Sequence, residues 1–579
     1  MVTGFSQNLR FSESFKAFSQ MRIAGESPTQ FAFASVIRAC VVLGSVEIGR
    51  QLHSLALKLG LACELFVGSN LADMYSKCGF MVEACKFFEE MPSKDAVSWT
   101  SMIDGYAKSG DFEAALLSYQ RMINDGIGVD KYVVSSALSA CSALKACQFG
   151  KCVHSTVVKL GLEVEVAVGN ALVDMYSKSG DMESALNVFH VHPECRNIVS
   201  YSSLINGYVE MDEIEKAFSV FVDLQRGGGV EPNQFTFSSL VKACANQAAL
   251  EQGIQLHAQV IKFNFDRDNF VSSVLVDMYG KCGLLDHSIQ VFDEIANPTE
   301  VAWNSLPSVF AVNGLGNDAL KTFSRMVRAG VKPNAITFII LLTGCSHSGS
   351  VEEGLTYFYF MEKTYGMVPR AGHYSCVIDL LGRAGRLEEA EEFINSMPMQ
   401  PNAFGWCFFL GACTIRGDKE GQTGSRKWED FRGVRKIMRD GSMKKLPGYS
   451  WVDIGNKTHT FGAKDWSHPQ KKKIYEKLDS LLDQIKKAGY VPNTDLVLHD
   501  MDDNSKVELL HHHSERIAIA FALVSMPGKP IIVKKNIRVC LDCHSAIKYI
   551  SLVVGRKIIV RDNTRFHHFA DGLCSCGDY

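Results

Sequence analysis

The chain has 579 residues, of which 46% are hydrophobic and 21% are charged, and its formal net charge is -3 with a pI of about 6.6. This composition is typical of a folded protein and excludes a disordered or fibrous one, while the length predicts several domains or an array of repeats. A chain of this charge is also a poor candidate for binding nucleic acid by phosphate neutralisation alone, although it could still recognise bases.

The 18 cysteines do not predict a disulfide framework, because no secretory signal peptide precedes them and the chain is far longer than disulfide-stapled domains. We therefore expect reduced thiols. No run of about 18 or more apolar residues occurs, so a membrane span is not expected. The first residues, Met1 to Phe5, also lack the Arg- and Ser-rich composition of an organelle-targeting leader.

From the N-terminus to about residue 402 the sequence repeats itself. One motif recurs about every 102 residues, as LADMYSKCG from Leu71, LVDMYSKSG from Leu172, LVDMYGKCG from Leu275 and VIDLLGRAG from Val377. Two further motifs fall between its copies, so each period holds three units of roughly 31 to 36 residues. Within a unit, apolar residues recur at helical spacing on both sides of a break such as Ser109-Gly110-Asp111, which predicts a helix-turn-helix. Such a hairpin cannot bury its apolar faces alone, so we expect the units to stack into an α-solenoid with one continuous core.

Cysteines and histidines recur at matching positions in these units. They are Cys40, Cys141, Cys244 and Cys345, and His53, His154 and His257. The cysteines lie beside small residues on a helix, where a packing role is more common than metal or redox chemistry. We expect a structural role for the histidines as well.

These repeats resemble the plant pentatricopeptide-repeat family, in its subclass with alternating long and short repeats, and the resemblance covers nearly the whole chain. It implies a mainly α protein in which about a dozen units over residues 1–402 form a right-handed α-solenoid. Because Val2 to Asn8 look like the interior of a first helix, we expect the first repeat to be incomplete and the chain to be truncated upstream. The tetratricopeptide repeat, which binds protein, has a similar unit length, but its aromatic and proline pattern does not recur here.

One helical repeat can recognise one unstacked RNA base with two or three side chains. The resemblance implies that these are a residue early in each first helix and the last residue of the repeat. The corresponding pairs are Ser69 with Asp95, Thr100 with Asp130, Asn170 with Asn197, Ser202 with Asn233, Ser273 with Thr299, and Asn304 with Asn334. The family's pairing pattern implies G, G, C and A for the first four pairs and C for the last, whereas Ser273 with Thr299 departs from the usual pairs. The alternative is that these residues are only helix caps and turn residues.

After residue 402 the repeats stop. We expect residues 403–446 to form an extension, and residues 447–579 have the pattern of a small α/β domain. Mixed β-branched and aromatic residues predict strands in PGYSWVDIGNKTHTF from Pro447, in PIIVK from Pro530 and in KIIV from Lys557. The stretch LLHHHSERIAIAFALV from Leu509 predicts helix.

The first chemical motif of this domain is His513-Ser514-Glu515, followed about 25 residues later by Cys540-Leu541-Asp542-Cys543. A zinc-dependent deaminase needs three protein ligands and an open position where a bound water is activated, and a glutamate that moves protons without binding the metal. The motif therefore predicts His513, Cys540 and Cys543 as ligands of a catalytic zinc. It predicts Glu515 as the proton shuttle during attack on carbon 4 of cytosine. A structural zinc site and a set of unrelated core residues are the alternatives.

The second motif consists of His544, His567, His568, Cys574 and Cys576. A closed four-ligand site of Cys and His contributes folding energy directly, which a small domain with a limited core needs. We therefore expect a second, structural zinc bound by one of the two adjacent histidines together with the other three residues, giving two zinc ions per chain. Apolar packing of both histidines is the alternative.

Together, HSERIAIAF, KKNIRVCLDCHSAIKYIS, IIVRDNTRFHHF and GLCSCGDY resemble the DYW domain, the cytidine-deaminase-like ending of organellar RNA-editing factors. The resemblance implies site-specific C-to-U editing of single-stranded RNA in mitochondria or chloroplasts. It also implies other editing factors as partners, and neither a membrane nor DNA is expected to be one.

Three features depart from the family pattern. Val539 stands where deaminases have a proline, the chain ends at Asp578-Tyr579 without a final Trp, and Gly411 to Val434 are much shorter than the family's connecting motif. The shortened connector leaves open a non-catalytic RNA-binding specificity factor for editing, splicing or transcript stability. A protein-binding scaffold is the third alternative.

Overall fold

The computed structural model describes the chain except for several short segments and one long one. The residues it leaves out are 63, 194–195, 228, 400–404, 407, 410–446, 455–456, 495–501, 527, 529, 563–564 and 577–579. Nearly all of the extension expected at 403–446, including the shortened stretch from Gly411 to Val434, lies outside the described residues, as do the final Asp578-Tyr579. The chain divides into two compact units, Met1–Ala243 and Cys244–Tyr579.

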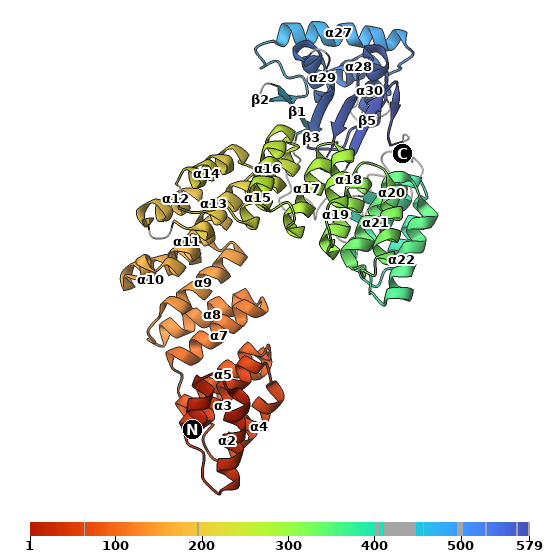
Figure 1. The fold of residues 1–579 in the computed structure, drawn as a ribbon. Coiled ribbons are helices and arrows are strands. Elements are labelled where there is room, and N and C mark those ends of the chain that lie inside the picture. The colour runs from red at the N-terminus through yellow and green to blue at the C-terminus, as the bar shows by residue number, and fades with distance from the viewer. Residues whose placement is uncertain are drawn as a thin grey trace. The chain divides into compact units, whose positions relative to one another are not determined.

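The first unit consists of paired helices, which Figure 1 shows as successive antiparallel hairpins. The helices are α1 (Val2–Gln7), α2 (Phe11–Ile23), α3 (Gln30–Leu43), α4 (Val46–Lys58), α5 (Leu65–Lys77), α6 (Met81–Glu90), α7 (Ala96–Ser109), α8 (Phe112–Asn124), α9 (Lys131–Leu144), α10 (Cys147–Leu160), the 3-10 helix η1 (Leu162–Val164), α11 (Val166–Lys178), α12 (Met182–Val191), α13 (Ile198–Glu210) and α14 (Ile214–Arg226). Helix α15 (Gln234–Gln247) spans the boundary between the units.

Side-chain caps begin several of these helices, and the pair α7 and α8 illustrates them. The side chain of Asp95 accepts a hydrogen bond from the backbone N–H of Ser98 in a capping box that begins α7. Gly110, with a φ of 85°, ends α7 in the left-handed region, and Asp111 then caps α8. The helix break predicted at Ser109-Gly110-Asp111 is therefore confirmed.

The second unit continues the hairpins and then changes to α/β structure (Figure 1). Its repeat helices are α16 (Leu250–Lys262), α17 (Asn269–Lys281), α18 (Leu285–Asp293), α19 (Glu300–Val312), α20 (Gly316–Arg328), α21 (Ala335–Ser348), α22 (Val351–Tyr365), α23 (Ala371–Ala384) and α24 (Leu387–Asn395). First helices of consecutive repeats pack against one another, as α17 does against α19 and α19 against α21. The predicted α-solenoid is confirmed, because this stacking buries the apolar faces that single hairpins would expose.

The recurring cysteines and histidines have the structural environments that packing residues need. Cys40, Cys141, Cys244 and Cys345 are fully buried, and burial raises the pKa of each thiol to about 12. The Nδ1 atoms of His53, His154 and His257 lie 2.8 to 2.9 Å from the hydroxyls of Tyr75, Tyr176 and Tyr279. Each histidine thus joins the second helix of one repeat to the first helix of the next.

A six-stranded sheet with flanking helices forms the C-terminal part of the second unit. The elements are β1 (Tyr449–Ile454), β2 (Lys457–Gly462), α27 (Lys471–Lys487), α28 (Asp503–His511), α29 (Ser514–Ser525), β3 (Ile531–Lys535), α30 (Leu541–Val554), β4 (Ile558–Arg561), β5 (Phe566–Ala570) and β6 (Leu573–Cys574). The strand order is β2-β1-β3-β4-β5-β6, and β3 and β4 are the parallel pair that α30 connects, with Ile531 opposite Ile558. Its core combines the inward faces of these strands with α27, α29 and α30.

The predicted strands at Pro447, Pro530 and Lys557 correspond to β1 with β2, to β3 and to β4. The stretch from Leu509, by contrast, is not one helix. α28 ends at His511, and α29 begins at Ser514 with His513 as its N-cap residue in extended conformation. This break allows the imidazole of His513 to project from the start of a helix rather than from its side. None of the described helices is both long and apolar enough to cross a lipid bilayer.

Candidate metal centres

The first candidate centre is built at the N-termini of two helices. His513 precedes α29 and Glu515 lies in its first turn, while Cys540 precedes α30 and Cys543 lies in its first turn. The backbone N–H of Cys543 donates a hydrogen bond to Sγ of Cys540 at 3.3 Å. Because free N–H groups and the helix dipole stabilise negative charge, this placement favours the thiolate form that binds metals.

The four ligand atoms of this group lie within 4.8 Å of one another. Nδ1 of His513 is 3.2 Å from Sγ of Cys543 and 3.5 Å from Sγ of Cys540. A tetrahedral zinc ion with ordinary Zn–N and Zn–S bond lengths separates such ligand atoms by roughly 3.6 Å. The three residues therefore fit a zinc ion, and both sulfurs are free thiols rather than parts of a disulfide.

The environment of Cys543 favours its ionised form. Burial alone raises the pKa of the thiol, but the hydrogen bond with Cys540 and the positive charges of His513 and Arg516 bring the pKa well below its ordinary value. This electrostatic arrangement is the one expected around a metal ligand.

Glu515 lies beside these ligands and is completely buried. Burial raises the pKa of its carboxyl group and the Cys543 thiolate raises it further, while Lys535 opposes both effects. Oε1 of Glu515 accepts a short hydrogen bond from Nζ of Lys535, and Oε2 accepts one from Oγ of Ser514 at 3.2 Å. A raised pKa favours the protonated form of this carboxyl group, which suits a residue that must both take up and release a proton.

Sequence reasoning missed Lys535. It ends strand β3, whose residues alternate between inward and outward faces, so Lys535 shares the inward face of Ile531 and Val533. The sequence did contain a signal, because Lys535 takes an inward position of the strand after the apolar residues Ile531 and Val533. A buried ammonium group needs an anionic partner, so such a lysine predicts a nearby carboxylate.

A second buried ion pair joins the two motifs. Arg516 and Asp542 are fully buried, and Nη2 of Arg516 donates a short hydrogen bond to Oδ2 of Asp542. Oδ1 of Asp542 accepts hydrogen bonds from the hydroxyl of Tyr490 at 2.7 Å and from the backbone N–H of Asn493 at 2.9 Å. Arg516 of α29 is thus bound to Asp542 of α30. This contact holds the N-termini of the two helices next to each other.

The second candidate centre combines residues of α30, β5, β6 and the turn after β6. Ligand atoms of His544, His567, Cys574 and Cys576 lie within 4.8 Å of one another. Nε2 of His544 is 3.1 Å from Sγ of Cys576, Nδ1 of His567 is 3.7 Å from Sγ of Cys574, and the two sulfurs are 3.3 Å apart. Nε2 of His567 faces the carboxylate of Asp562 at 3.5 Å, the kind of contact that orients a metal-bound imidazole. The four residues fit a closed zinc site.

The adjacent histidines His567 and His568 have different surroundings in the structure. Successive residues of a strand point to opposite faces, so His567 points into the cluster while His568 points away from it. Nε2 of His568 lies 3.1 Å from Oδ1 of Asn313 in the loop after α19. His568 is therefore not part of the four-residue group.

The expected RNA-recognition residues meet in pairs in several repeats. Oγ of Ser69 donates to Oδ1 of Asp95 at 2.9 Å, and Nδ2 of Asn197 donates to Oδ1 of Asn170 at 3.1 Å. A threonine hydroxyl links two further pairs: Thr236 contacts both Ser202 and Asn233, and Thr337 contacts both Asn304 and Asn334. Thr100 and Ser273 instead donate to carbonyls of their own helices.

The last residue of each pair also immediately precedes the next helix. Asp95, Asp130, Asn197 and Asn334 are N-cap residues whose side chains accept backbone hydrogen bonds, Asn233 accepts one from Thr236 N–H, and Thr299 is an N-cap without such a bond. Capping thus occurs as the alternative interpretation expected. In the aspartates and asparagines it uses the oxygen Oδ1, and the other polar atom of the side chain can form more than one hydrogen bond, so capping and base recognition are compatible.

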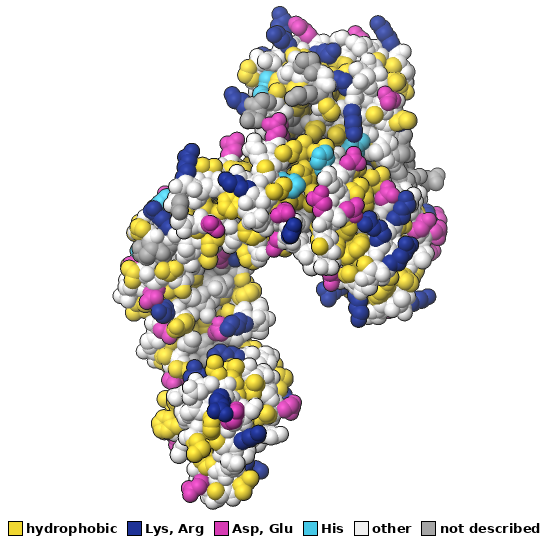
Figure 2. All heavy atoms as spheres, viewed as in Figure 1, with side chains coloured by type: hydrophobic (Ala, Val, Ile, Leu, Met, Phe, Trp, Pro, Cys, Tyr) yellow, Lys and Arg dark blue, Asp and Glu magenta, His cyan; other side chains and the backbone are white. Residues whose placement is uncertain are grey.

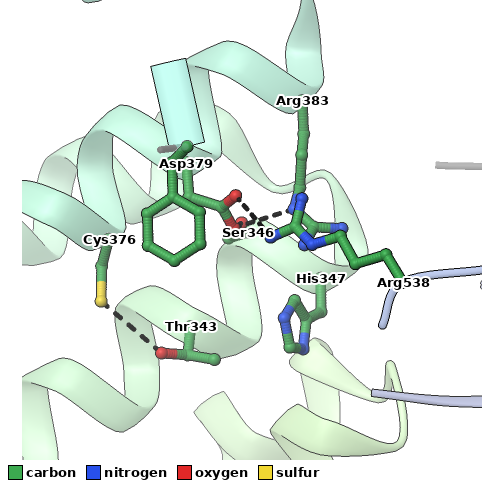
Figure 3. Close-up of a pocket in the computed structure, with 8 residues that line it drawn as sticks. Thr343, Ser346, His347, Cys376, Asp379, Arg383 and Arg538 are labelled. Atoms are coloured by element: carbon green, nitrogen blue, oxygen red, sulfur yellow. Dashed lines mark hydrogen bonds and ion pairs between the residues drawn. The ribbon is translucent and has the colours of Figure 1, made fainter. Parts of the chain in front are cut away.

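A pocket of about 170 Å³ lies beside α21 and α23, close to the chain segment that leads to Cys540 (Figure 3). Asp379 accepts hydrogen bonds there from Oγ of Ser346 at 2.7 Å, from Nε of Arg383 at 2.8 Å and from Nη2 of Arg538 at 3.3 Å. Burial raises the pKa of Asp379, but the two guanidinium groups lower it below its ordinary value. The pocket therefore holds an ion cluster that ties the residues before Cys540 to a repeat helix.

Comparisons with known proteins cover both parts of the chain. Residues 489–579 match the DYW family of nucleic acid deaminases, and residues 458–485 match the E+ motif. The PPR repeat matches residues 69–95, 97–127, 170–191, 270–297, 336–363 and 372–400, and the PPR repeat family matches residues 196–246 and 298–347.

Individual relatives match over the whole length. A putative pentatricopeptide repeat-containing protein of Arabidopsis thaliana is 38% identical over 606 residues, which cover 100% of this chain and 73% of that protein. A second Arabidopsis pentatricopeptide repeat-containing protein, named as chloroplastic, is 38% identical. That match covers 98% of this chain and 70% of the relative. Among solved structures, the pentatricopeptide repeat protein PPR10 from maize is 18% identical with a TM-score of 0.49, over 77% of this chain and 68% of that one.

Proposed function

Because the chain belongs to the pentatricopeptide-repeat family and ends in a DYW deaminase domain, we propose that it binds single-stranded RNA with its repeats and converts a selected cytidine to uridine. The observation that carries this proposal is the buried carboxylate of Glu515 beside the ligand atoms of His513, Cys540 and Cys543. Three ligands leave one position open on a tetrahedral metal, and the fourth group is an acid-base residue.

The residues of the site have distinct roles in this proposal. A zinc ion held by His513, Cys540 and Cys543 would supply Lewis acidity that lowers the pKa of a bound water toward neutrality. Glu515 takes up the proton released when water adds to carbon 4 of cytosine. The same carboxyl group then protonates the exocyclic N4, which leaves as ammonia. Arg516 and Asp542 keep the two ligand-bearing helices in register, and Lys535 orients the Glu515 carboxylate.

The second cluster supplies stability rather than chemistry. His544, His567, Cys574 and Cys576 would fill all four positions of a zinc ion and leave none for water or substrate. We therefore assign two zinc ions per chain, one catalytic and one structural.

Substrate selection is assigned to the paired residues of the repeats, from Ser69 with Asp95 to Asn304 with Asn334. Their recurrence in register across repeats and their contacts between neighbouring hairpins support this role. We infer G, G, C, A and C as the preferred bases of five pairs, a mitochondrion or chloroplast as the compartment, and other editing factors as partners.

Replacement of Glu515 by Ala tests the catalytic proposal. We expect E515A to retain its zinc content and RNA affinity and to lose conversion, because no other described group of the cluster can both stay off the metal and move a proton. The matched control is E508A, which removes an exposed glutamate of α28. Sequencing of a candidate RNA after incubation with each zinc-loaded protein measures conversion, and equal conversion by E515A and the wild type refutes the proposal.

One observation favours a second candidate function. Glu515 is inaccessible to solvent and bonded to Lys535, so its carboxylate is engaged in the RNA-free protein. If this contact persists with RNA bound, the chain acts as a non-catalytic specificity factor. The same assay separates the two functions, because such a factor binds the RNA and leaves it unchanged even as the wild type.

A further inference from the structure

Trp466 is a large aromatic side chain that the fold leaves in solvent. It lies in the turn between β2 and α27 and is 55% exposed. Its indole stacks on the ring of Tyr475 with 4.0 Å between centroids and 3° between planes, and Tyr475 itself is only 7% exposed. One face of the indole is therefore covered by a buried ring, while the side chain as a whole remains open to other molecules.

The turn that carries Trp466 is held in place by hydrogen bonds on both sides of it. The hydroxyl of Tyr475 donates to the carbonyl oxygen of Asp465 at 2.9 Å. The carboxylate of Asp465 accepts from the backbone N–H and the hydroxyl of Ser467, at 2.8 and 2.6 Å. A stacked and anchored indole loses little conformational entropy when a second flat group binds to it.

The stretch of sequence that contains Trp466 is basic although the whole chain is slightly acidic. Residues 464–473 contain four lysines, Lys464, Lys471, Lys472 and Lys473, against the single acidic residue Asp465. All four lysines are exposed, whereas Asp465 is occupied within the turn. Figure 2 shows Lys and Arg side chains at both ends of α27. An aromatic face beside cations that can neutralise phosphates is the arrangement that binds unpaired nucleic acid.

This turn is also joined to the first candidate centre. The backbone N–H of Lys464 donates to the carbonyl oxygen of His512 at 3.1 Å, and the ring of His512 lies 5.6 Å from that of Tyr475. His512 immediately precedes His513, which we assign to the catalytic zinc. A base stacked on Trp466 would therefore belong to a nucleotide close to the one being converted.

We propose that Trp466 is a stacking platform for an unpaired base of the RNA that flanks the target cytidine, with the neighbouring lysines facing its phosphates. This platform rests on the proposed function, since only a nucleic-acid substrate gives it a role. It accepts any base, because every base has a π-face, and it contributes to substrate positioning rather than to the proton transfers.

The test compares binding by four zinc-loaded full-length proteins: wild type, W466A, W466F and V491A. Val491 is an apolar residue of the same domain that is 78% exposed, which makes V491A the matched control. The probes are a short single-stranded oligocytidylate and an abasic strand of the same length and charge. We expect W466A to bind the oligocytidylate roughly ten-fold more weakly or worse, W466F to lose less, and V491A to match the wild type. The abasic strand should bind all four proteins equally.

Intrinsic fluorescence gives a second measurement. Stacking of a base on the exposed indole should quench Trp466 emission, so the quenching by oligocytidylate should be smaller in W466F than in the wild type. If W466A fails to fold, W466L replaces it, because leucine keeps an apolar side chain without an aromatic face.

The outcomes separate this inference from the proposed function. Equal oligocytidylate affinities for wild type, W466A and W466F overturn the platform, even if E515A shows that the protein is a deaminase. A loss confined to base-containing RNA in W466A supports the platform, even if the wild type converts no cytidine and the proposed enzyme fails.

Discussion

The first unit and the C-terminal α/β region bury different kinds of polar side chain. Among the described residues of Met1–Ala243, every buried polar side chain is a serine or threonine. The α/β region instead buries Glu515, Arg516, Lys535 and Asp542, together with His544 and His567 of the second candidate centre. A buried hydroxyl group is uncharged and costs little to bury when one hydrogen-bond partner is available, whereas a buried charge requires a partner of opposite charge. The repeats of the first unit are thus stabilised mainly by close packing, whereas the α/β region also depends on buried ion pairs and on its proposed metals.

Removal of zinc should have the largest effect and should be confined to the α/β region. Each ion lost would remove stabilisation on the order of several kcal/mol, because metal-binding energy contributes directly to folding. Hydrogen exchange before and after chelation would measure this, with amides of α29, α30 and β5 losing protection and those of α7 to α13 retaining it. C574S should lower the zinc content by one ion. Equal loss of protection in both regions after chelation would contradict the claim that only the α/β region depends on metal.

Breaking the buried ion pair should have the next largest effect. R516M leaves Asp542 buried without its guanidinium partner and should lower the free energy of unfolding by about 3–5 kcal/mol. The control is R121M, which removes an ion pair of the first unit whose side chains are about half exposed and should cost about 1 kcal/mol or less. Denaturant unfolding of both variants measures the difference, and similar losses would show that burial of charge does not distinguish the regions.

One repeat of the second unit should lose stability when the pH falls, because it also buries an ionisable side chain, His347. Burial lowers the pKa of His347 from 6.5 to about 4, and its Nδ1 lies 2.8 Å from the carbonyl oxygen of Ala311. As the pH falls, His347 therefore binds a proton in the unfolded chain before it does so in the folded chain. The free energy of unfolding that depends on neutral His347 is fully present above pH 6.5 and is lost as the pH falls toward 4. The loss attributable to His347 should be about 3 kcal/mol at most.

Urea unfolding of wild type and H347Q across this pH range isolates the contribution of His347. The other histidines of the second unit with lowered pKa values titrate in both proteins, so they cancel in the difference. An identical pH dependence for the two proteins would mean that His347 accepts a proton without destabilising the fold.

The smallest effect on stability should come from D95N, which separates capping from base recognition. Asparagine caps helices about as well as aspartate, so the free energy of unfolding should change by only a few tenths of a kcal/mol. The substitution converts the pair of Ser69 with Asp95 into the Ser–Asn combination of Ser202 with Asn233. We therefore expect the preferred base at this repeat to change from G to A, measured by affinity for RNAs that differ at one position. An unchanged preference would leave Asp95 as a cap alone.

Much of the fold was predictable because its determinants are local. The recurrence of motifs from Leu71 to Val377 predicted stacked hairpins, and residues such as Gly110 and Asp111 predicted where helices end. The helix break before His513 was not predicted. Apolar residues continue on both sides of it, whereas α29 packs against β1 in the tertiary structure and the hydroxyls of Ser450 and Ser514 lie 2.9 Å apart.

The candidate metal centres were predictable only in part. The spacing of His513, Glu515, Cys540 and Cys543 predicted one group of residues, because the ligand types of a zinc deaminase are distinctive. The choice between His567 and His568 depended on which face of β5 each occupies, and the strand itself was not predicted. Lys535 was missed because its partner lies on another element, 20 residues earlier in the chain.

The repeat period, the positions of the caps and the types of residue that can bind zinc can all be inferred without coordinates, since each follows from spacing along the chain or from side-chain chemistry. Tertiary structure alone decided that Lys535 meets Glu515, that Arg516 meets Asp542, and that Trp466 remains exposed on Tyr475. These contacts join segments whose separation is set by how the sheet and helices pack. The spacing of residues along the chain does not predict which of these segments come together.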